Sequence, residues 1–143
     1  MDYTKLKAIL AEPAYSGLSD ADAATALNVA DQTVTFENHV TGRDLMAEVG
    51  AVLGAGILEK LEAAAASSPP IKWAMKDIDG GDGINVGHAE TRAMLDSLVG
   101  TVLAQAEVDA VKALGEKVVS RAEKEGLGFI DGGHVTNARA GSW

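Results

Sequence analysis

Apolar residues recur at helical spacing through most of this 143-residue sequence, and glycine, proline and serine separate the stretches. The pattern predicts a helix that ends before Pro13, a second that begins after Ser19 and a third that begins after Thr41. Only the run from Thr33 to Val40 is rich in β-branched residues and alternates, which is typical of a strand. The sequence therefore predicts a mainly α protein, a single small helical domain with one or two short β-strands.

Glycines and prolines predict where the remaining helices end. We expect Gly54 and Gly56 to interrupt the helix that follows Thr41, and the Ser-Ser-Pro-Pro run at 67–70 to end the next one. Trp73 falls in the short helix that follows the prolines. The other predicted helical stretches are 90–99, 104–114, 118–125 and 134–140.

A glycine-rich acidic stretch, residues 77–87, has no helical period and is predicted to be a loop. It would join two helical halves, about 1–76 and 88–140, within one domain spanning 1–143. Its carboxylates at Asp77, Asp79 and Asp82 suggest a cation site, but an EF-hand needs glycine where Asp82 stands and glutamate where His88 stands. We therefore expect a polar hinge, and keep a divalent-cation-dependent binding module or enzyme at this loop as an alternative.

Composition narrows the classes of partner and cofactor. The chain has no cysteine, which excludes disulfides and thiolate metal sites. Its 12 basic and 21 acidic residues give a net charge of −9, which disfavours binding to nucleic acid. No secretory signal pattern opens the sequence, and no stretch approaches about 20 apolar residues, so we expect a soluble protein without a membrane span.

Catalytic motifs are not recognisable in the sequence. There is no G-x-S-x-G elbow, and the glycine-rich DGGDG run lacks the lysine of a phosphate-binding loop. His39, His88 and His134 match no zinc-binding spacing. We therefore expect a protein that is not an enzyme, with no catalytic, cofactor-binding or metal-binding residues and no cofactor.

Exposed apolar and aromatic residues are the better candidates for function. A strand edge can be completed by another chain, and an exposed tryptophan is typical of a contact residue. Trp143 follows Gly141 and Ser142 with no local structure to bury it, so we expect it to dock on a neighbouring surface. The expected interface residues are Val34, Phe36, Val40, Trp73 and Trp143.

Several segments together carry a family resemblance that covers most of the chain. They are GAGILEKLEAAAASSPPIKWAM at 54–75, GINVGHAETRAMLDSL at 83–98, and SRAEKEGLG at 120–128 followed by HVTNARA, after the helix that ends in Leu27 and Asn28. This series resembles a family of small proteins encoded among the tail and structural genes of tailed bacteriophages and prophages. The resemblance identifies no catalytic residue.

The resemblance implies a non-enzymatic structural component of a tailed-phage virion, in the tail, neck or fibre-attachment region. Its partners would be other phage structural proteins in a symmetric multi-copy assembly, with no nucleic acid, and its location would be the virion, after synthesis in the host cytoplasm. A transient tail or fibre assembly factor, absent from the finished particle, would have the same sequence features and remains the alternative.

Overall fold

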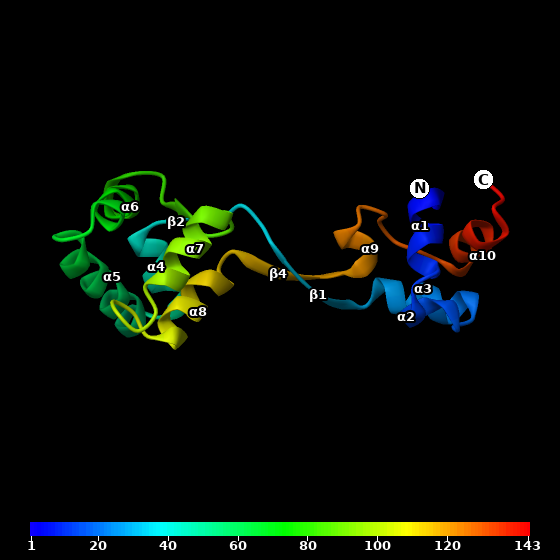
Figure 1. Cartoon of the computed structure of the whole chain (residues 1–143), viewed down its shortest axis with the longest axis horizontal. Coiled ribbons are helices and arrows are strands. Elements are labelled where there is room, and N and C mark those ends of the chain that lie inside the picture. Colours follow the sequence, from blue (N-terminus) through cyan, green and yellow to red (C-terminus); the bar gives the residue numbers. More distant parts are fainter. The chain divides into compact units, whose positions relative to one another are not determined.

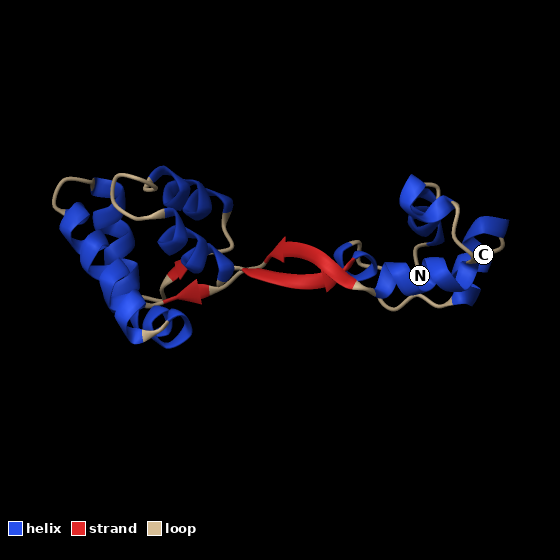
Figure 2. Ribbon diagram, turned by 90° about the horizontal axis from the view of Figure 1, so that it is seen from below, coloured by secondary structure: helices blue, strands red, loops and turns tan.

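The computed structural model describes residues 1–143 and contains ten helices and four short strands (Figure 1). The helices are α1 (Tyr3–Leu10), α2 (Pro13–Ser16), α3 (Asp20–Asn28), α4 (Gly42–Val49), α5 (Ala51–Ala65), α6 (Pro69–Gly80), α7 (Ala89–Ser97), α8 (Gln105–Ala113), α9 (Arg121–Lys124) and α10 (Gly132–Ala140). The strands, red in Figure 2, are β1 (Ala30–Thr35), β2 (His39–Val40), β3 (Ile84–Asn85) and β4 (Glu116–Ser120). They form two sheets of two strands, β1 with β4 and β2 with β3. The mainly helical class predicted from the sequence is confirmed.

Internal contacts divide the chain into two compact units. Unit 1 comprises residues 1–34 and 118–143, and unit 2 comprises residues 35–117. The stretch 77–87 lies inside unit 2, and it is not the loop that the sequence predicted: residues 77–80 form the last turn of α6 and residues 84–85 form β3. The acidic residues continue the helix because Met75 and Ile78 still face the core of the unit.

In unit 1, α10 packs against both α1 and α3. Ser19 begins α3 as the sequence predicted, since its side-chain oxygen accepts a hydrogen bond from the Asp22 N–H at 3.1 Å. Asp131 caps α10 in the same way through the His134 N–H. The fully buried side chains of this core are Leu6, Leu27, Ile130 and Val135.

Unit 2 holds α4 to α8 and the antiparallel β2–β3 pair, in which His39 faces Asn85 and Val40 faces Ile84. Thr41 caps α4, as predicted. The break expected at Gly54 and Gly56 is wrong: the helix ends at Gly50, whose φ of 100° favours glycine, and α5 runs through both later glycines. Gly54 allows α4 and α5 to approach closely, because a Cβ there would lie 2.8 Å from the Met46 Cα.

Two further predictions from the sequence need correction. The helix expected over 118–125 is instead β4 followed by the short α9, which Ser120 caps. Val118 and Val119 are β-branched and pair in a strand, so tertiary context outweighs the helical spacing. The strand expected over 33–40 is divided into β1 and β2, and Asn38 between them donates its side-chain amide to the Leu114 carbonyl at 2.8 Å.

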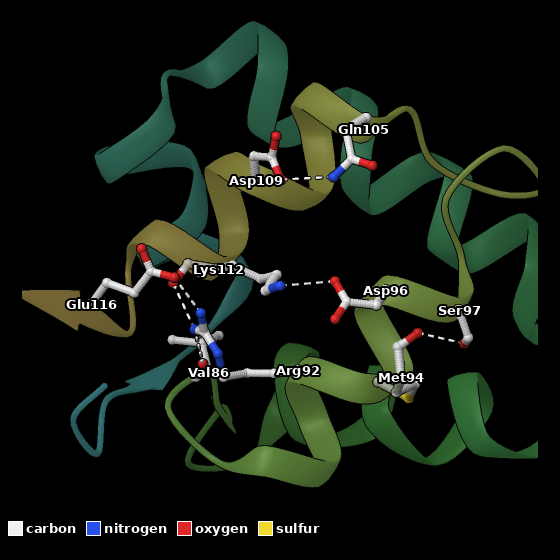
Figure 3. Close-up of polar contacts among 9 residues, drawn as sticks. All are labelled: Val86, Arg92, Met94, Asp96, Ser97, Gln105, Asp109, Lys112 and Glu116. Atoms are coloured by element: carbon white, nitrogen blue, oxygen red, sulfur yellow. Dashed lines mark hydrogen bonds and ion pairs between the residues drawn. The ribbon is translucent and has the colours of Figure 1, made fainter. Parts of the chain in front are cut away.

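A polar network joins α7 to α8 (Figure 3). The Arg92 guanidinium donates to the backbone carbonyls of Val86 at 3.1 Å and Lys112 at 3.0 Å, and it forms an ion pair with Glu116. The Lys112 ammonium pairs with Asp96 at 2.8 Å. Arg92 thereby satisfies a backbone carbonyl in the last turn of α8. It also connects α7 to Lys112 and Glu116, which lie 20 and 24 residues further along the chain.

Glu107, a buried carboxylate on α8, is the basis of a pH prediction. The Ala104 N–H at 2.9 Å and the Lys60 ammonium at 2.7 Å hold the pKa of Glu107 below its ordinary value. A pKa lower in the folded than in the unfolded state stabilises the protein above the unfolded pKa of about 4.3, and this contribution is lost as the pH falls through the folded pKa. We expect Glu107→Gln to lower the free energy of unfolding at pH 7, by an amount that shrinks on acidification.

Urea unfolding of both proteins between pH 7 and acidic pH checks this expectation. The matched control is Glu62→Gln, because Glu62 is exposed on α5 and forms no ion pair. A difference between wild type and Glu107→Gln that stays constant across this pH range would contradict the assigned role of the charge.

Candidate interaction surfaces

Unit 1 carries an open groove of about 490 Å³ along α3. One wall is formed by small or polar side chains of α3, and the other by the segment that leads into α10. Phe129, which is 76% exposed, and the half-exposed Val29 stand at this groove. The lining residues are Ala21, Ala24, Thr25, Asn28, Val29, Phe129, Ile130, Asp131 and Gly132.

Asn28 positions the Phe129 side of the groove. Its side-chain amide donates to the Ile130 carbonyl at 2.6 Å, and its carbonyl oxygen accepts from the Ile130 N–H at 3.0 Å. The pair of bonds resembles the exchange between facing residues of a sheet, and it holds the backbone next to Phe129 against the end of α3. Ile130 itself is fully buried, so Phe129 points outward while its neighbour is anchored in the core.

A second surface is the outer face of α6 in unit 2. Trp73 is 64% exposed, and the Lys76 ammonium lies 3.9 Å from the centroid of its ring, which is a close cation–π contact. Neither Lys76 nor the exposed Lys72 forms an ion pair, although the chain has far more acidic than basic residues. This face therefore combines a large aromatic surface with two cations that are not neutralised within the protein.

Trp143 lies against its own chain. Its ring stacks on Tyr3 with a centroid distance of 5.7 Å and an interplanar angle of 13°, and the Lys7 ammonium lies 5.8 Å from it. The C-terminal residues thus return to α1, which the sequence pattern did not indicate. Trp143 nevertheless remains 60% exposed, so one face of the indole stays available for contact.

The other residues expected at an interface differ in accessibility. Val34 in β1 and Phe36 after it are half-buried, and the Lys117 ammonium lies 5.7 Å from the Phe36 ring. Val40 is only 5% exposed and packs in the core of unit 2, so its side chain is already covered within the chain. Val34 and Trp143 belong to unit 1, whereas Phe36, Val40 and Trp73 belong to unit 2.

Several ionisable side chains form helix caps or ion pairs, and none forms a cluster suited to a metal ion. Asp77 and Asp79 lie on α6, Asp82 follows in the turn, and no group of three or more His, Asp or Glu side chains is placed to hold a metal ion. His39 pairs with Glu37 at 3.0 Å, and the His134 ring accepts a hydrogen bond from the Asp131 N–H.

The shifted pKa values have structural causes. Hydrogen bonds from Thr136 and Arg139 lower the pKa of Asp20, which links α3 to α10. Hydrogen bonds from Thr41 lower the pKa of Asp44 in the cap of α4. Burial raises the pKa of the Tyr15 hydroxyl. The Asp20 carboxylate therefore stabilises the packing of α3 against α10, and the Asp44 carboxylate stabilises the N-terminus of α4.

Sequence reasoning missed Val29 and Phe129 as surface residues. Phe129 and Ile130 are consecutive residues between α9 and α10, and the first is exposed whereas the second is fully buried. Gly126 and Gly128, just before Phe129, both have positive φ values, which favour glycine. These two closely spaced glycines were the signal in the sequence that the chain turns before Phe129.

In comparisons with known proteins, no family model, curated protein or solved structure matches the chain. None of the helices has both the length and the apolar character that a membrane crossing requires.

Proposed function

We propose that this protein is a non-enzymatic structural component of a tailed-phage virion, located in the tail, neck or fibre-attachment region, and that it acts through contacts with other structural proteins. The sequence resemblance described above supplies the virion setting. The molecular surface supplies the means of contact, since large apolar side chains stand exposed on both units.

The observation that carries the proposal is the exposure of aromatic side chains that the fold holds in place. Phe129 is anchored through Ile130, Trp73 is covered by the Lys76 ammonium on one side, and Trp143 is stacked on Tyr3. Positioned aromatic residues are typical of the residues that dominate protein–protein binding energy. Their exposure costs hydrophobic free energy in a free chain, and burial against a partner recovers it.

Mass spectrometry of purified particles from a phage that encodes the protein tests this proposal directly. We expect the protein in intact virions at a reproducible copy number relative to a known structural protein. Its absence from finished particles, combined with failure of the tail or a fibre to assemble without it, would identify a transient assembly factor. Absence from particles with normal assembly would contradict both functions.

The groove of unit 1 gives a finer test. Phe129→Ala removes an exposed side chain that makes no contribution to the core, so we expect reduced incorporation into particles with an unchanged free energy of unfolding. Lys124→Ala is the matched control, because Lys124 is exposed in the same unit and forms no ion pair. Equal incorporation of the two variants would exclude Phe129 as a contact residue.

A further inference from the structure

Unit 2 has a groove of about 490 Å³ that is lined by α4, by β2 with the residues before it, and by the end of α8. Its apolar surface comes from Leu114, the half-buried Phe36 and the buried Val40. Two exposed carboxylates of α4, Asp44 and Glu48, also line the groove, and no lysine or arginine does. The groove therefore combines an apolar surface with negative charge.

Neither carboxylate of the groove is neutralised within unit 2, because the ion pairs of this unit involve other residues. Hydrogen bonds from Thr41 lower the pKa of Asp44, so this side chain is ionised at neutral pH. His39, which also lines the groove, is hydrogen-bonded at 3.0 Å to Glu37, which does not. Two negative charges are thus left without a cation beside the apolar surface.

Glu48 is unfavourably placed in the free chain. It lies in the last turn of α4, where the helix macrodipole favours a basic residue. It also lies four residues after Asp44, and like charges at this spacing destabilise a helix. A side chain that lowers stability without a compensating contact is typical of a functional site. A cation that a partner places in the groove offsets both unfavourable effects.

We propose that this groove binds a segment of another protein in which an arginine or lysine stands beside an apolar side chain. The cation pairs with Asp44 and Glu48, and the apolar side chain packs on Phe36 and Leu114. The Phe36 ring also accepts a cation, since the Lys117 ammonium lies 5.7 Å from its centroid. Charge complementarity thus selects a basic partner segment over an acidic one.

This inference goes beyond the proposed function, since it names one groove and the chemistry of its partner, and it holds whether or not the protein occurs in virions. Its test is an NMR titration of the isotope-labelled full chain with the acetylated and amidated peptide Ala-Leu-Arg-Arg-Leu-Ala. We expect saturable changes in the backbone amide shifts of residues 36–40, 44–48 and 113–114. The analogue with glutamine in place of both arginines should cause no such changes.

The variant Glu48→Lys makes the test specific for the groove. Lysine in the last turn of α4, four residues after Asp44, is favourable for the helix, so the variant should unfold at a higher urea concentration than wild type. Its affinity for the arginine peptide should nevertheless fall by about fivefold or more. The control Glu59→Lys makes the same change in net charge at an exposed residue of α5 outside the groove, and should weaken binding by less than about twofold.

Four results would overturn the proposal. Amide shifts in the groove that do not change on titration of the wild-type protein exclude the site. An equal loss of affinity in Glu48→Lys and Glu59→Lys would reduce the binding to a general attraction by the net negative charge. Equal binding of the glutamine analogue would show that apolar contact alone is sufficient. Shifts of the same amides that depend on protein concentration, without peptide, would place a second copy of the chain in the groove.

Discussion

Replacing Gly87 by alanine is expected to destabilise unit 2 by about 3 kcal/mol or more, among the largest effects of any single substitution in this protein. A Cβ at position 87 would lie 1.8 Å from the Phe36 carbonyl oxygen and 2.5 Å from its carbon. Both obstructing atoms belong to the backbone, so no side-chain rotation relieves the overlap. The strand segments must therefore separate, and the midpoint of urea unfolding should fall markedly.

The neighbouring hydrogen bonds make this separation costly. The Val86 N–H donates to the Asn38 carbonyl at 3.0 Å, and the Asn38 N–H donates to the Asn85 side chain at 3.1 Å. Moving residue 87 away from Phe36 breaks these bonds together with the β2–β3 pairing.

Gly56→Ala is the control for the Gly87 substitution, because a Cβ at position 56 in α5 meets nothing within 4 Å. The control should stabilise the helix by about 0.5–1 kcal/mol, since alanine loses less backbone entropy than glycine. A Gly87→Ala protein that unfolds at the wild-type urea concentration would contradict the close approach of Gly87 and Phe36.

Asn28→Ala should have the second large effect, a loss of about 3 kcal/mol in unfolding free energy. The substitution removes the hydrogen bonds at 2.6 and 3.0 Å to the backbone of Ile130 and provides no replacement partner. Because Ile130 is fully buried, its N–H and carbonyl lose partners in a place where water has little access. The backbone that carries Phe129 also loses its anchor, so the surface of the groove should change.

Two variants separate this effect from the general cost of losing an asparagine. Asn137→Ala removes an exposed side chain from α10 for which the structure shows no side-chain hydrogen bond, and it should leave the free energy of unfolding within about 0.5 kcal/mol of wild type. Asn28→Asp keeps an acceptor for the Ile130 N–H but places a carboxylate oxygen against the Ile130 carbonyl. We therefore expect Asn28→Asp to be destabilised as well. The free energy of unfolding of each variant is measured by urea unfolding at pH 7. Wild-type stability of either Asn28 variant would contradict the role of the amide.

Local signals predicted most helix ends correctly. Ser19 and Thr41 begin helices because a side-chain oxygen next to the first turn satisfies a free N–H, which requires no distant partner. Pro69 and Pro70 occupy the first turn of α6 for an equally local reason, since proline lacks the N–H that a helix interior needs.

The errors lie where a distant segment changes the local preference. Gly54 lies inside α5 and does not end it. Met46 of α4 occupies the space that a side chain at position 54 would need, so glycine is the residue that fits there. Val118 and Val119 join a strand because β1, which is far away in the sequence, provides the pairing. Neither partner could be identified from the spacing of apolar residues.

Among the interaction surfaces, the exposure of Trp73 and Trp143 follows from their surroundings in the folded chain. The sequence marked both as contact residues, but it did not indicate that Lys76 would lie over one ring or that Tyr3 would stack on the other. Val40 shows the opposite case, because an apolar residue in a strand can face either a partner or the core, and here it faces the core.

The amino-acid sequence by itself determined the helical class, the caps of α3 and α4, the acidic charge and the absence of thiol chemistry, since these depend on composition or on neighbours within one helical turn. Tertiary structure alone decided that residues 1–34 and 118–143 form one unit, which strands pair, and which apolar side chains remain exposed. These features depend on contacts between residues far apart in the chain, and a local pattern of residues contains no information about the partner that it will meet.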